Sequence, residues 1–575
     1  MGMDKKIDSL IEAFALENAL SHKGKAAPGG VVGKVIAADP SVKGEMNELT
    51  RRVIAVIKEV NNLSFDEQRI LLEERHPEML NKPKKEKSDE LKDLDNVDPQ
   101  KGVVMRFSPS PSGPMHIGHA LTGGLTSLYV EKYGGRFILR IEDTNSDNID
   151  PYAYDQLPKD ADWLFGNVSK VWVQSDRMGV YYDYMDKFLE KEAVYVCTCS
   201  QEEFKKHSLA KKDCPCRALM PAVQKARWKK MLDKDGFKAG EAVVRFKSSM
   251  QDKNPAMRDF PLMRINESEH PRQGRKYRAW PLMNFAVAVD DIEAGMTHII
   301  RAKDHADNAK RQAMMYKALE LSFSPQVYFL GRYNFDGLEL SCSKTRARIE
   351  AGEFSGWSDI RLPFIEALKR RGYQPGAFKK YTRQVGLSLT DKSVKAEEFY
   401  KGLNALNKEI LDPVSKRFFL IRNPQKIKVE NAPAKEVELD LHPDNEKGGR
   451  NFRTGNEFYI EEADFKALKK DGLYRLMDCL NLYSKDGKFM FDSFEYEKYK
   501  AHGNRIIHWL PADKESFELL LKVEVLMPDN MTVECLGEPG LDSVNVGDVI
   551  QAERFGFMRL DSKEKGVLRF WFAHN

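Results

Sequence analysis

The chain has 575 residues, of which 42% are hydrophobic, and its formal net charge at pH 7 is only +4. This length predicts several domains, about three to five, with enough apolar side chains for real cores. A small net charge neither requires nor excludes a nucleic-acid partner. No apolar run approaches the roughly 20 residues of a membrane span, and no secretory signal is visible, so we expect a cytoplasmic protein with no membrane partner. Seven cysteines, four of them in two C-x-C pairs, favour a reducing compartment over a disulfide framework.

The first 81 residues predict a helical extension, because apolar residues recur at helical spacing, as at Ile7, Leu10, Ile11 and Phe14. Residues 82–101 carry twelve charged side chains in twenty positions and few aliphatic ones. Such a composition is typical of a linker or a solvated arm. We therefore expect an N-terminal helical extension (1–81) joined by a charged linker (82–101) to the region that follows.

A strand–loop–helix–strand order follows the linker. Residues 103–107 and 137–141 have the composition of strands, and residues 120–133 that of a helix that ends at two glycines. This order predicts one βαβ unit of a parallel sheet. Its loop, residues 109–119, reads PSPSGPMHIGH. Because such a loop delivers a helix N-terminus to the carboxyl end of a strand, where free N–H groups favour phosphate, it predicts a phosphate-binding site.

Two histidines in this loop, His116 and His119, are three residues apart and therefore lie on one face of the first helical turn. Gly118 between them permits a ligand to approach the backbone closely. This arrangement suits a triphosphate. An HxxH pair by itself also occurs in proteins that bind no phosphate, and it could be part of a zinc site, so the rest of the chain has to decide.

The composition changes after about residue 191. Residues 201–240 hold eleven Lys or Arg against five Asp or Glu, a local charge of +6. Strand-like runs return at residues 285–289 and 298–301, and a helix is expected after Asp304. A parallel sheet interrupted by an insertion explains this order. The predicted parts are the first half of the sheet (102–190), the inserted domain (191–280) and the second half with its following loop (281–345).

The C-terminal part of the chain changes from helical to β-rich. Residues 346–411 have helical patterning, and residues 361–384 alone hold seven Lys or Arg and one acidic residue. From residue 412 to 575, short β-branched and aromatic runs alternate with turn signals, which indicates antiparallel barrels. The predicted fold class is therefore a multidomain α/β protein, with a Rossmann-type parallel-sheet domain, an insertion, a helical region and C-terminal antiparallel β-barrels.

Four patterns lie in order along the chain. Residues 106–119 read RFSPSPSGPMHIGH, residues 139–145 LRIEDTN, residues 340–344 LSCSK and residues 356–363 GWSDIRLP. They resemble the HIGH motif, an amino-acid-binding strand end, the KMSKS motif and the segment after it in class I aminoacyl-tRNA synthetases of the glutamyl/glutaminyl branch.

The C-terminal half carries the same resemblance. His442-Pro443 and residues 506–509 (IIHW) are similar to the β-barrel anticodon domains of the archaeal and eukaryotic members. Bacterial glutamyl enzymes instead end in a helical cage. The chain therefore resembles the archaeal-type glutamyl-tRNA synthetases.

The resemblance implies an ATP-dependent ligase. Glutamate would attack the α-phosphate of ATP to form glutamyl-adenylate and pyrophosphate, with Mg²⁺ accompanying ATP, and the glutamyl group would then pass to the 3′ end of tRNA(Glu), or of both tRNA(Glu) and tRNA(Gln). The implied catalytic residues are His116 and His119, which donate to the phosphates, and Lys344, which meets the leaving pyrophosphate. The same resemblance places Pro109, Gly118, Arg301 and Ser343 in the ATP site.

The second motif departs from the KMSKS pattern. Ser341 and Cys342 stand where lysine and methionine are usual, whereas the Ser-Lys pair that follows is kept. The loss of one cation leaves part of the pyrophosphate stabilisation to other groups. Arg346 and Arg348 are candidates.

Several positions bear on the choice of amino acid. Arg106 has the forked guanidinium that binds a carboxylate bidentately, and the resemblance assigns it to the side-chain carboxylate of the substrate. Ser108 and Glu142 match positions that hold the α-amino group. Glutaminyl enzymes usually carry aspartate in place of Glu142, which favours glutamate over glutamine.

Three further residues complete the implied glutamate site. Met283 stands where the family usually has a tyrosine, so the hydroxyl contact to the substrate is in doubt, and Asn284 is the candidate to replace it. Arg301 aligns with an arginine near the nucleotide and the substrate carboxylate. A buried structural ion pair is the alternative interpretation of Arg301.

The two C-x-C pairs, Cys197/Cys199 and Cys214/Cys216, are separated by fourteen residues. Four thiolates in two close pairs fit tetrahedral zinc in a structural role, and the family sometimes carries zinc in this insert. C-x-C is tighter than the usual C-x₂-C spacing, so reduced, metal-free thiols are the alternative.

Contacts with tRNA follow from the same resemblance. The basic insert (191–280) is expected to bind the acceptor end, and the helical region (346–411) the inside of the L, with Trp357 and Arg361 as implied contacts. The barrels (412–575) would stack on and read splayed anticodon bases.

Three alternatives stay open at this stage. A glutaminyl-tRNA synthetase shares the motifs, and Glu142 argues against it. A small-molecule nucleotidyltransferase also uses an HxGH phosphate loop, but the second motif and the long C-terminal barrel region argue against it. A catalytically dead tRNA-binding scaffold is the non-enzymatic alternative, and the intact His116, His119 and Lys344 argue against that.

Overall fold

Apolar residues at helical spacing in the first part of the chain fold as helices, as expected: α1 (Gly2–Ser21), α2 (Pro28–Ala38), α3 (Met46–Val60) and α4 (Phe65–Arg75). Ile11, Leu16 and Val53 are fully buried among them. In this computed structural model the chain divides into two units, Met1–Asp89 and Glu90–Asn575. The structure describes residues 2–22, 24–79, 90–468 and 470–575, so residues 82–89 of the predicted linker lie outside the described residues.

The rest of the predicted linker does not form a solvated arm. Leu91 and Leu94 are buried against the core of the second unit, with 9% and 6% of their surface exposed. The Leu94 amide donates to the Tyr133 hydroxyl at 2.9 Å, and the Asp95 amide donates to the Tyr328 hydroxyl at 2.6 Å. The charged side chains at residues 90–101 hid these two apolar anchors, and only their packing shows that this stretch belongs to the folded unit.

The predicted βαβ unit is present. Strands β1 (Val103–Phe107), β2 (Gly135–Ile141) and β3 (Val168–Val173) pair in parallel in the order β1-β2-β3. A second parallel pair is formed by β8 (His298–Ala302) and β9 (Gln326–Leu330). The Thr297 amide donates to the Val104 carbonyl at 3.0 Å, which joins the two pieces edge to edge. The carboxyl ends of β1, β2 and β8 therefore meet at one edge, where ligands bind in such sheets.

One predicted strand is wrong. Residues 285–289 lie in helix α10 (Met283–Ala294), not in a strand, and all five are buried. A short continuous apolar run fits a buried helix as well as a buried strand, so periodicity alone could not separate them. The helix ends at Gly295, whose φ of +65° closes its C-terminus.

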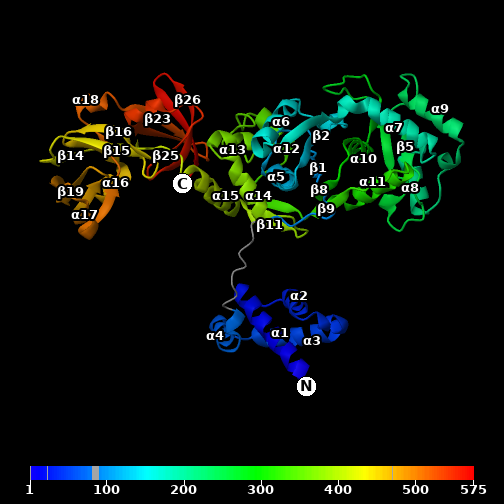
Figure 1. Ribbon diagram of the computed structural model, residues 1–575, viewed down its shortest axis with the longest axis horizontal. Coiled ribbons are helices and arrows are strands. Elements are labelled where there is room, and N and C mark those ends of the chain that lie inside the picture. The colour runs from blue at the N-terminus through cyan, green and yellow to red at the C-terminus, as the bar shows by residue number, and fades with distance from the viewer. Residues whose placement is uncertain (1, 23, 80–89, 469) are drawn as a thin grey trace. The chain divides into compact units, whose positions relative to one another are not determined.

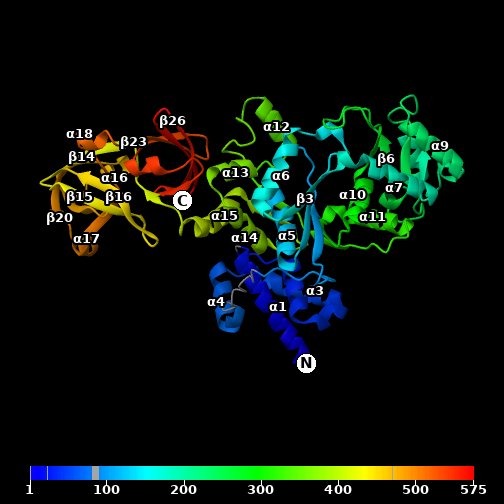
Figure 2. The same cartoon turned by 45° about the horizontal axis from the view of Figure 1, so that its top comes forward.

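Helix α5 (Ile117–Tyr133) packs against β1 on one side and α14 (Pro375–Val385) on the other (Figures 1 and 2). Two small residues make this close packing fit. A Cβ on Gly123 would lie 2.5 Å from the Phe165 ring, and a Cβ on Gly124 would lie 3.0 Å from the Thr382 hydroxyl. The helix that begins at the histidine loop is thus held tightly on both faces.

The inserted part of the chain builds its own antiparallel sheet, in the order β4-β5-β6-β7. Its strands are β4 (Val194–Cys197), β5 (Val243–Phe246), β6 (Pro261–Ile265) and β7 (Ala279–Pro281), with helices α7 (Met178–Glu190), α8 (Gln201–Leu209) and α9 (Pro221–Leu232). The chain returns to the parallel sheet through α10, β8 and α11 (Ala306–Ala318). The helices that follow the second motif are α12 (Cys342–Glu350), α13 (Ile365–Arg371), α14 and α15 (Ala396–Leu411).

The C-terminal part forms two seven-stranded sheets, most of whose neighbouring strands are antiparallel. The first runs β12-β25-β26-β27-β23-β24-β13. Its edge strands β12 (Arg417–Phe418) and β13 (Leu420–Arg422) are separated by one residue, so the sheet curls into a nearly closed barrel. The second runs β21-β18-β19-β20-β14-β17-β22.

The remaining strands of these sheets are β14 (Pro424–Glu430), β17 (Glu457–Glu461), β18 (Gly472–Leu476), β19 (Leu480–Lys485), β20 (Lys488–Ser493), β21 (Gly503–Ile507), β22 (Leu510–Pro511), β23 (Leu521–Leu526), β24 (Thr532–Gly537), β25 (Val549–Ala552), β26 (Gly556–Glu564) and β27 (Val567–His574). A separate hairpin joins β15 (Lys435–His442) to β16 (Glu446–Thr454). No described helix combines the length and apolar character that a membrane crossing needs.

Gly135, at the start of β2, gives a test of this packing. A Cβ there would lie 2.0 Å from the Val103 carbonyl oxygen, and its φ is +114°. Gly135→Ala should therefore lower the free energy of unfolding by roughly 3 kcal/mol or more, measured by urea titration. Gly166→Ala is the matched control, because Gly166 also has a positive φ (+69°) but its nearest neighbour would be 3.9 Å away. Equal losses in the two variants would contradict the close approach of β1 and β2.

Candidate active site

The two histidines stand at the N-terminus of α5. His116 is its N-cap, and its Nδ1 accepts from the Gly118 amide at 3.1 Å. The Nδ1 of His119 accepts from the His116 amide at 3.4 Å, and the two rings stack 3.8 Å apart. Because both Nδ1 atoms accept, the proton of each neutral ring is on Nε2, where it is a donor for a ligand.

Burial keeps both histidines neutral. It lowers the pKa of His116 well below its ordinary value, with the neighbouring His119 adding to the effect, and it lowers the pKa of His119 to about 4. Two neutral N–H donors at a helix N-terminus suit a phosphate whose charge grows during reaction.

A cavity of about 400 Å³ opens beside this helix end. It brings together six residues that the sequence predicted for the site and that lie far apart along the chain. They are Arg106, Ser108, His119, Glu142, Met283 and Arg301. His305, from the turn before α11, also lines the cavity and was not predicted.

The side chains in this cavity are suited to a ligand with charges of both signs. Arg106 and Arg301 are 7% and 8% exposed, so their guanidinium groups are largely desolvated. The Ser108 hydroxyl is buried and has no hydrogen-bond partner among the described residues. A buried polar atom without a partner carries a free-energy penalty that a bound ligand relieves.

A buried ion-pair network behind the cavity was missed. Asp291 accepts from Arg106 Nε at 3.2 Å and from Arg140 Nη1 at 2.7 Å. Arg140 is fully buried and also donates to Glu142 Oε1 at 3.1 Å. The surrounding carboxylates raise the pKa of Arg140 against the opposing effect of burial. The adjacent pair Asp290-Asp291, at the end of an apolar run, was the available sequence signal.

This network fixes the position of two substrate-facing groups at once. One carboxylate, that of Asp291, holds Arg106, and the arginine that shares it holds Glu142. Glu142 is also tied to the histidine loop, because its amide donates to the Pro109 carbonyl at 3.0 Å. The carbonyl group of Pro109, a residue predicted for ATP binding, thus helps to hold the end of β2.

Arg301 is held from α11. Its Nη1 donates to Gln312 Oε1 at 2.9 Å. Burial and the neighbouring Arg106 lower the pKa of Arg301 to about 10, and the guanidinium stays charged. Asn284 does not line the cavity; it donates to Asn308 at 3.1 Å and accepts from Gln312 at 3.5 Å. Asn284 thus supports Gln312, the partner of the arginine, and its contact with the substrate stays a prediction.

A smaller cavity of about 140 Å³ adjoins the first. It shares Thr122 and Ala302 with the larger one and is lined on its other sides by Gly118 and Gly331. A Cβ on Gly331 would lie 2.3 Å from the Thr390 carbonyl, so that edge is backbone. Gly118 lines this cavity, and the close approach of a ligand to its backbone stays a prediction.

The second motif forms the start of α12. Its N-cap is Ser341, whose hydroxyl accepts from the Lys344 amide at 3.5 Å and lies 3.2 Å from the Ser343 hydroxyl. Lys344 is exposed, and its Nζ lies 3.3 Å from Glu339 Oε2. Neither Ser343 nor Lys344 lines the two cavities, so both reach a ligand there only if this exposed turn moves toward it.

The other cations of this segment are engaged within the protein. Arg346 Nη1 donates to the Ile149 carbonyl at 3.4 Å, and Arg348 Nε donates to Glu353 at 2.8 Å. Cys342, in the place of the usual methionine, is buried with its Sγ 3.9 Å from the Pro114 carbonyl. The second motif thus packs on the histidine loop through this thiol.

Backbone hydrogen bonds join the histidine loop to the segment that follows the second motif. The Ile117 amide donates to the Pro363 carbonyl at 3.2 Å, and the Ile365 amide donates to the Met115 carbonyl at 2.9 Å. On the opposite side, Asp160 accepts from the Met115 amide at 2.9 Å. The residue before His116 is therefore held from two directions.

Trp357 and Arg361 have partners inside the protein. The Trp357 ring packs 4.9 Å from the Phe364 ring and lies against Gly113. Arg361 pairs with Asp359 at 2.8 Å, which helps to hold the pKa of that carboxyl below its usual range. Both residues shape the segment that follows the second motif, and their contact with tRNA stays a prediction.

The four predicted metal ligands meet in the inserted part. The Sγ atoms of Cys197, Cys199, Cys214 and Cys216 all lie within 4.8 Å of one another. The Cys197–Cys214 and Cys199–Cys216 separations are 3.9 and 3.8 Å. Zn–S bonds of about 2.3 Å in a tetrahedron place sulfur atoms about 3.8 Å apart, so the cluster fits zinc.

Comparison with known proteins agrees with this geometry. The model of the tRNA synthetases class I (E and Q) catalytic domain matches residues 102–413. Two models of the anticodon-binding domain of the same synthetases match residues 415–493 and 506–561. The chain belongs to this family of class I synthetases.

Relatives extend the similarity over the whole length. A glutamate–tRNA ligase of Methanothermobacter marburgensis is 38% identical over 99% of this chain and 100% of its own. Those of Methanocaldococcus jannaschii and Pyrococcus furiosus are 39% and 38% identical, each over 99% of this chain and 100% of its own. The expected archaeal-type glutamyl branch of the class I synthetases is thereby confirmed.

The histidine geometry predicts a specific loss. His119→Ala removes one neutral donor from the phosphate site and should slow amino-acid activation by about 10²-fold while tRNA affinity changes less than about twofold. Pyrophosphate exchange and filter binding measure the two quantities. Equal losses in both would make His119 a structural residue.

The lowered histidine pKa values also set a pH dependence. Since His119 titrates near 4 in the folded protein, activation should not fall through its protonation between about pH 5 and 7. The free energy of unfolding depends on pH differently. Below about pH 6.5 the two histidines bind protons in the unfolded chain but stay neutral in the folded one, so acidification from there toward pH 4 destabilises the fold. Activity and thermal melting, measured over the same pH range, separate the two effects.

Asp160 should act through the loop that it holds. Asp160→Ala removes the acceptor of the Met115 amide and should lower kcat/KM for ATP by about tenfold. Asp160→Asn keeps an acceptor oxygen and should retain most of the activity. Burial raises the pKa of Asp160 to about 7, so in the wild type its charge is lost as the pH falls through that value. The kcat/KM of the wild type for ATP should therefore change near pH 7, whereas that of the asparagine variant should not. Equal defects in both variants would contradict this role.

Proposed function

We propose that this protein is a glutamate–tRNA ligase that activates glutamate with ATP and transfers it to tRNA(Glu). The observation that carries the proposal is the charge pattern of the larger cavity. It presents two guanidinium groups, Arg106 and Arg301, and one carboxylate, Glu142. Glutamate offers the complementary set of two carboxylates and one ammonium group.

The same pattern argues against glutamine. A neutral side-chain amide would replace the charge-assisted hydrogen bonds between the substrate carboxylate and the desolvated Arg106 by weaker neutral ones. Arg106 binds the side-chain carboxylate, Arg301 the second carboxylate, and Glu142 with the Ser108 hydroxyl the ammonium group. Met283 packs against the aliphatic part of the substrate.

In this proposal ATP extends from the smaller cavity toward the larger one. The smaller cavity, beside Gly118, takes the adenine, and the triphosphate runs past the Nε2 atoms of His116 and His119. Attack of the glutamate carboxylate on the α-phosphate then needs little more than alignment and stabilisation of charge. Mg²⁺ bound with ATP neutralises charge on the leaving pyrophosphate.

Lys344 completes the site when the turn at the start of α12 moves inward. Its ammonium group exchanges its exposed partner Glu339 for the β- and γ-phosphates, with Ser343 alongside. An exposed ion pair of this kind contributes little free energy, about 0–1 kcal/mol, so a triphosphate can displace it.

Zinc held by Cys197, Cys199, Cys214 and Cys216 is the proposed structural cofactor of the inserted part. The separations between their sulfur atoms support it, and the Thr198 amide donates to Cys216 Sγ at 3.4 Å, as expected for a thiolate ligand. Bound zinc would cross-link the two segments that carry the cysteines and would take no part in the reaction.

The tRNA partner is recognised by several parts of the chain in this proposal. The basic insert contacts the acceptor end, the helices after the second motif, with Trp357 and Arg361, contact the inside of the L, and the barrels read the anticodon. The cytoplasm is the compartment in which these partners meet.

A competition assay tests the function directly. Purified protein with ATP, Mg²⁺ and tRNA(Glu) should form glutamyl-tRNA and should prefer glutamate over glutamine by about 10³-fold or more. Charging of tRNA(Gln) in a parallel reaction decides whether one or both tRNAs are substrates. Absence of glutamyl-tRNA would overturn the ligase proposal, and comparable charging with glutamine would overturn its substrate assignment.

A further inference from the structure

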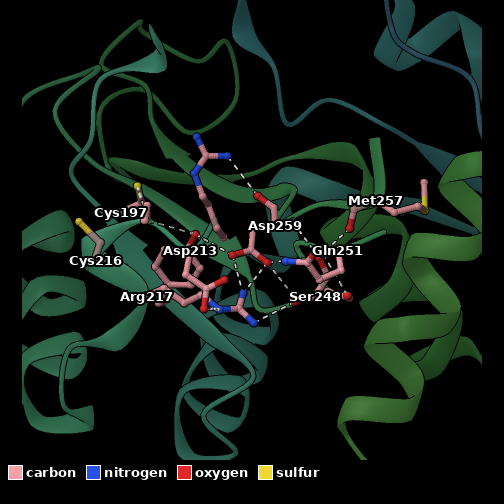
Figure 3. Close-up of polar contacts among 12 residues, drawn as sticks. Cys197, Asp213, Cys216, Arg217, Ser248, Gln251, Met257 and Asp259 are labelled. Carbon is pink, nitrogen blue, oxygen red and sulfur yellow. Dashed lines mark hydrogen bonds and ion pairs between the residues drawn. The ribbon is translucent and has the colours of Figure 1, made fainter. Parts of the chain in front are cut away.

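The loop 248–259, between β5 and β6, contacts two parts of the protein. One is the region of the cysteine cluster, and the other is helix α11, which supports Arg301 of the amino-acid cavity. Asp259 is the loop's best-connected residue. Its fully buried carboxylate accepts from the Ser248 amide at 2.8 Å, from Arg217 Nη1 at 2.6 Å and from the Tyr195 hydroxyl at 2.9 Å (Figure 3). Neither the fold nor the proposed reaction accounts for this concentration of bonds on one carboxylate.

On one side, this loop holds the segment that carries two of the cysteines. Arg217 follows Cys216 directly in the sequence and is anchored by Asp259. Gln251 Nε2 donates to the Lys211 carbonyl at 2.7 Å, and Arg258 Nη1 donates to the Ser208 carbonyl at 2.7 Å. The segment from residue 208 to 217 is thus bound at both of its ends.

Tyr195 adds a direct link to the cluster. Its hydroxyl, which bonds Asp259, also lies 3.5 Å from Cys214 Sγ. Tyr195 is fully buried in β4, two residues before Cys197. Asp259 therefore reaches one ligand-bearing segment through Arg217 and the other through Tyr195.

On its other side, the loop holds α11. Asn254 Nδ2 donates to Asp307 Oδ2 at 3.0 Å, and Arg311 Nε donates to the Ala256 carbonyl at 2.8 Å. The next residue of α11, Gln312, accepts from Arg301. A continuous chain of bonds therefore runs from the cysteine cluster through the loop to an arginine of the amino-acid cavity.

The backbone of Asp259 shows that its conformation depends on these bonds. Its φ is +33°, in the left-handed region that non-glycine residues seldom adopt, and such a conformation persists only where the surroundings hold it. The Asp259 amide itself donates to the Ser248 hydroxyl at 2.7 Å, and that hydroxyl donates to the Met257 carbonyl at 2.6 Å. Loss of the carboxylate would remove the bonds from Arg217, Tyr195 and the Ser248 amide, so the strained backbone would keep its bond to the Ser248 hydroxyl but lose these three.

We propose that the loop 248–259 positions Arg301 for substrate binding from the cysteine cluster, and that Asp259 is the positioning residue on which this bridge depends. The inference rests on the proposed function, because Arg301 is taken to bind a carboxylate of glutamate. Asp259 touches no substrate; it acts through α11 and Gln312.

Two variants test the bridge from its two ends. Asp259→Asn weakens the anchor of the cysteine segment and should raise the KM for glutamate by about fivefold or more, with the KM for ATP unchanged within about twofold. It should also speed release of zinc to a chromogenic chelator. Arg311→Ala removes one of the two bonds between the loop and α11, and the bond from Asn254 to Asp307 stays. It should still raise the KM for glutamate measurably, by about threefold or more, without changing zinc release.

Each variant has a matched control. Asp213→Asn removes the exposed second partner of Arg217, at 3.3 Å, and Lys317→Ala removes an exposed cation of α11 away from the loop. Both should keep wild-type KM values. Thermal melting of all four proteins, in the full-length chain, identifies any variant that fails to fold.

The outcomes separate this inference from the proposals beneath it. Unchanged glutamate KM in a folded Arg311→Ala protein, or equal rises in the KM for glutamate and ATP, would overturn the bridge. Wild-type protein without zinc but with both predicted KM effects would support the loop and refute only the metal. Wild-type protein that forms no glutamyl-tRNA would overturn the ligase proposal and the inference together.

Discussion

The backbone pairing of residues 115–117 with residues 363–365 is the constraint on which the site depends. It joins the loop before α5 to the segment after the second motif, although more than 240 residues separate them in the sequence. Hydrogen bonds between main-chain groups fix both the separation and the relative orientation of the two segments. The backbone of His116 is therefore oriented by a distant part of the chain that does not line the two cavities.

The same pairing continues toward the C-terminal barrels. Helix α13 begins at Ile365, and at its other end Arg370 pairs with Asp561 through two bonds of 2.7 Å. Its neighbour Arg371 is buried and donates to the carbonyls of Phe572 and Ala573 at 3.1 and 2.8 Å. A helix of two turns therefore spans from the histidine loop to the strands of the barrel, and displacement at one end must be absorbed at the other.

A network of buried ion pairs is the second constraint on the site. Arg140, Asp290 and Asp291 have no exposed surface, and removal of one partner would leave another charge buried without compensation. Arg177 pairs with Asp290 at 2.7 Å, so both carboxylates are compensated. Such a network contributes little to stability overall, but it leaves Arg106 and Glu142 with one orientation each, which is what discrimination between similar amino acids needs.

The sequence by itself determined the parts of the site that are local. Short-range rules on turns, helix starts and strand composition predict the loop at residues 109–119, the strand at 103–107 and the shared face of the two histidines. Residue type alone indicates the cysteine pairs. These features hold wherever the segment is placed, because the physical cause lies within about ten residues of it.

Only the tertiary structure decided what depends on partners distant in the chain. Residues 285–289 form a buried helix, although an apolar run of this length fits a buried strand equally well. Leu91 and Leu94 are core residues because the folded unit offers an apolar surface on which they pack. Asn284 supports Arg301 and does not line the cavity, and the shared carboxylate of Asp291 is seen only once β1, β2 and α10 are packed. Residue type predicts which chemistry is available, but burial and long-range pairing decide which atom is free to perform it.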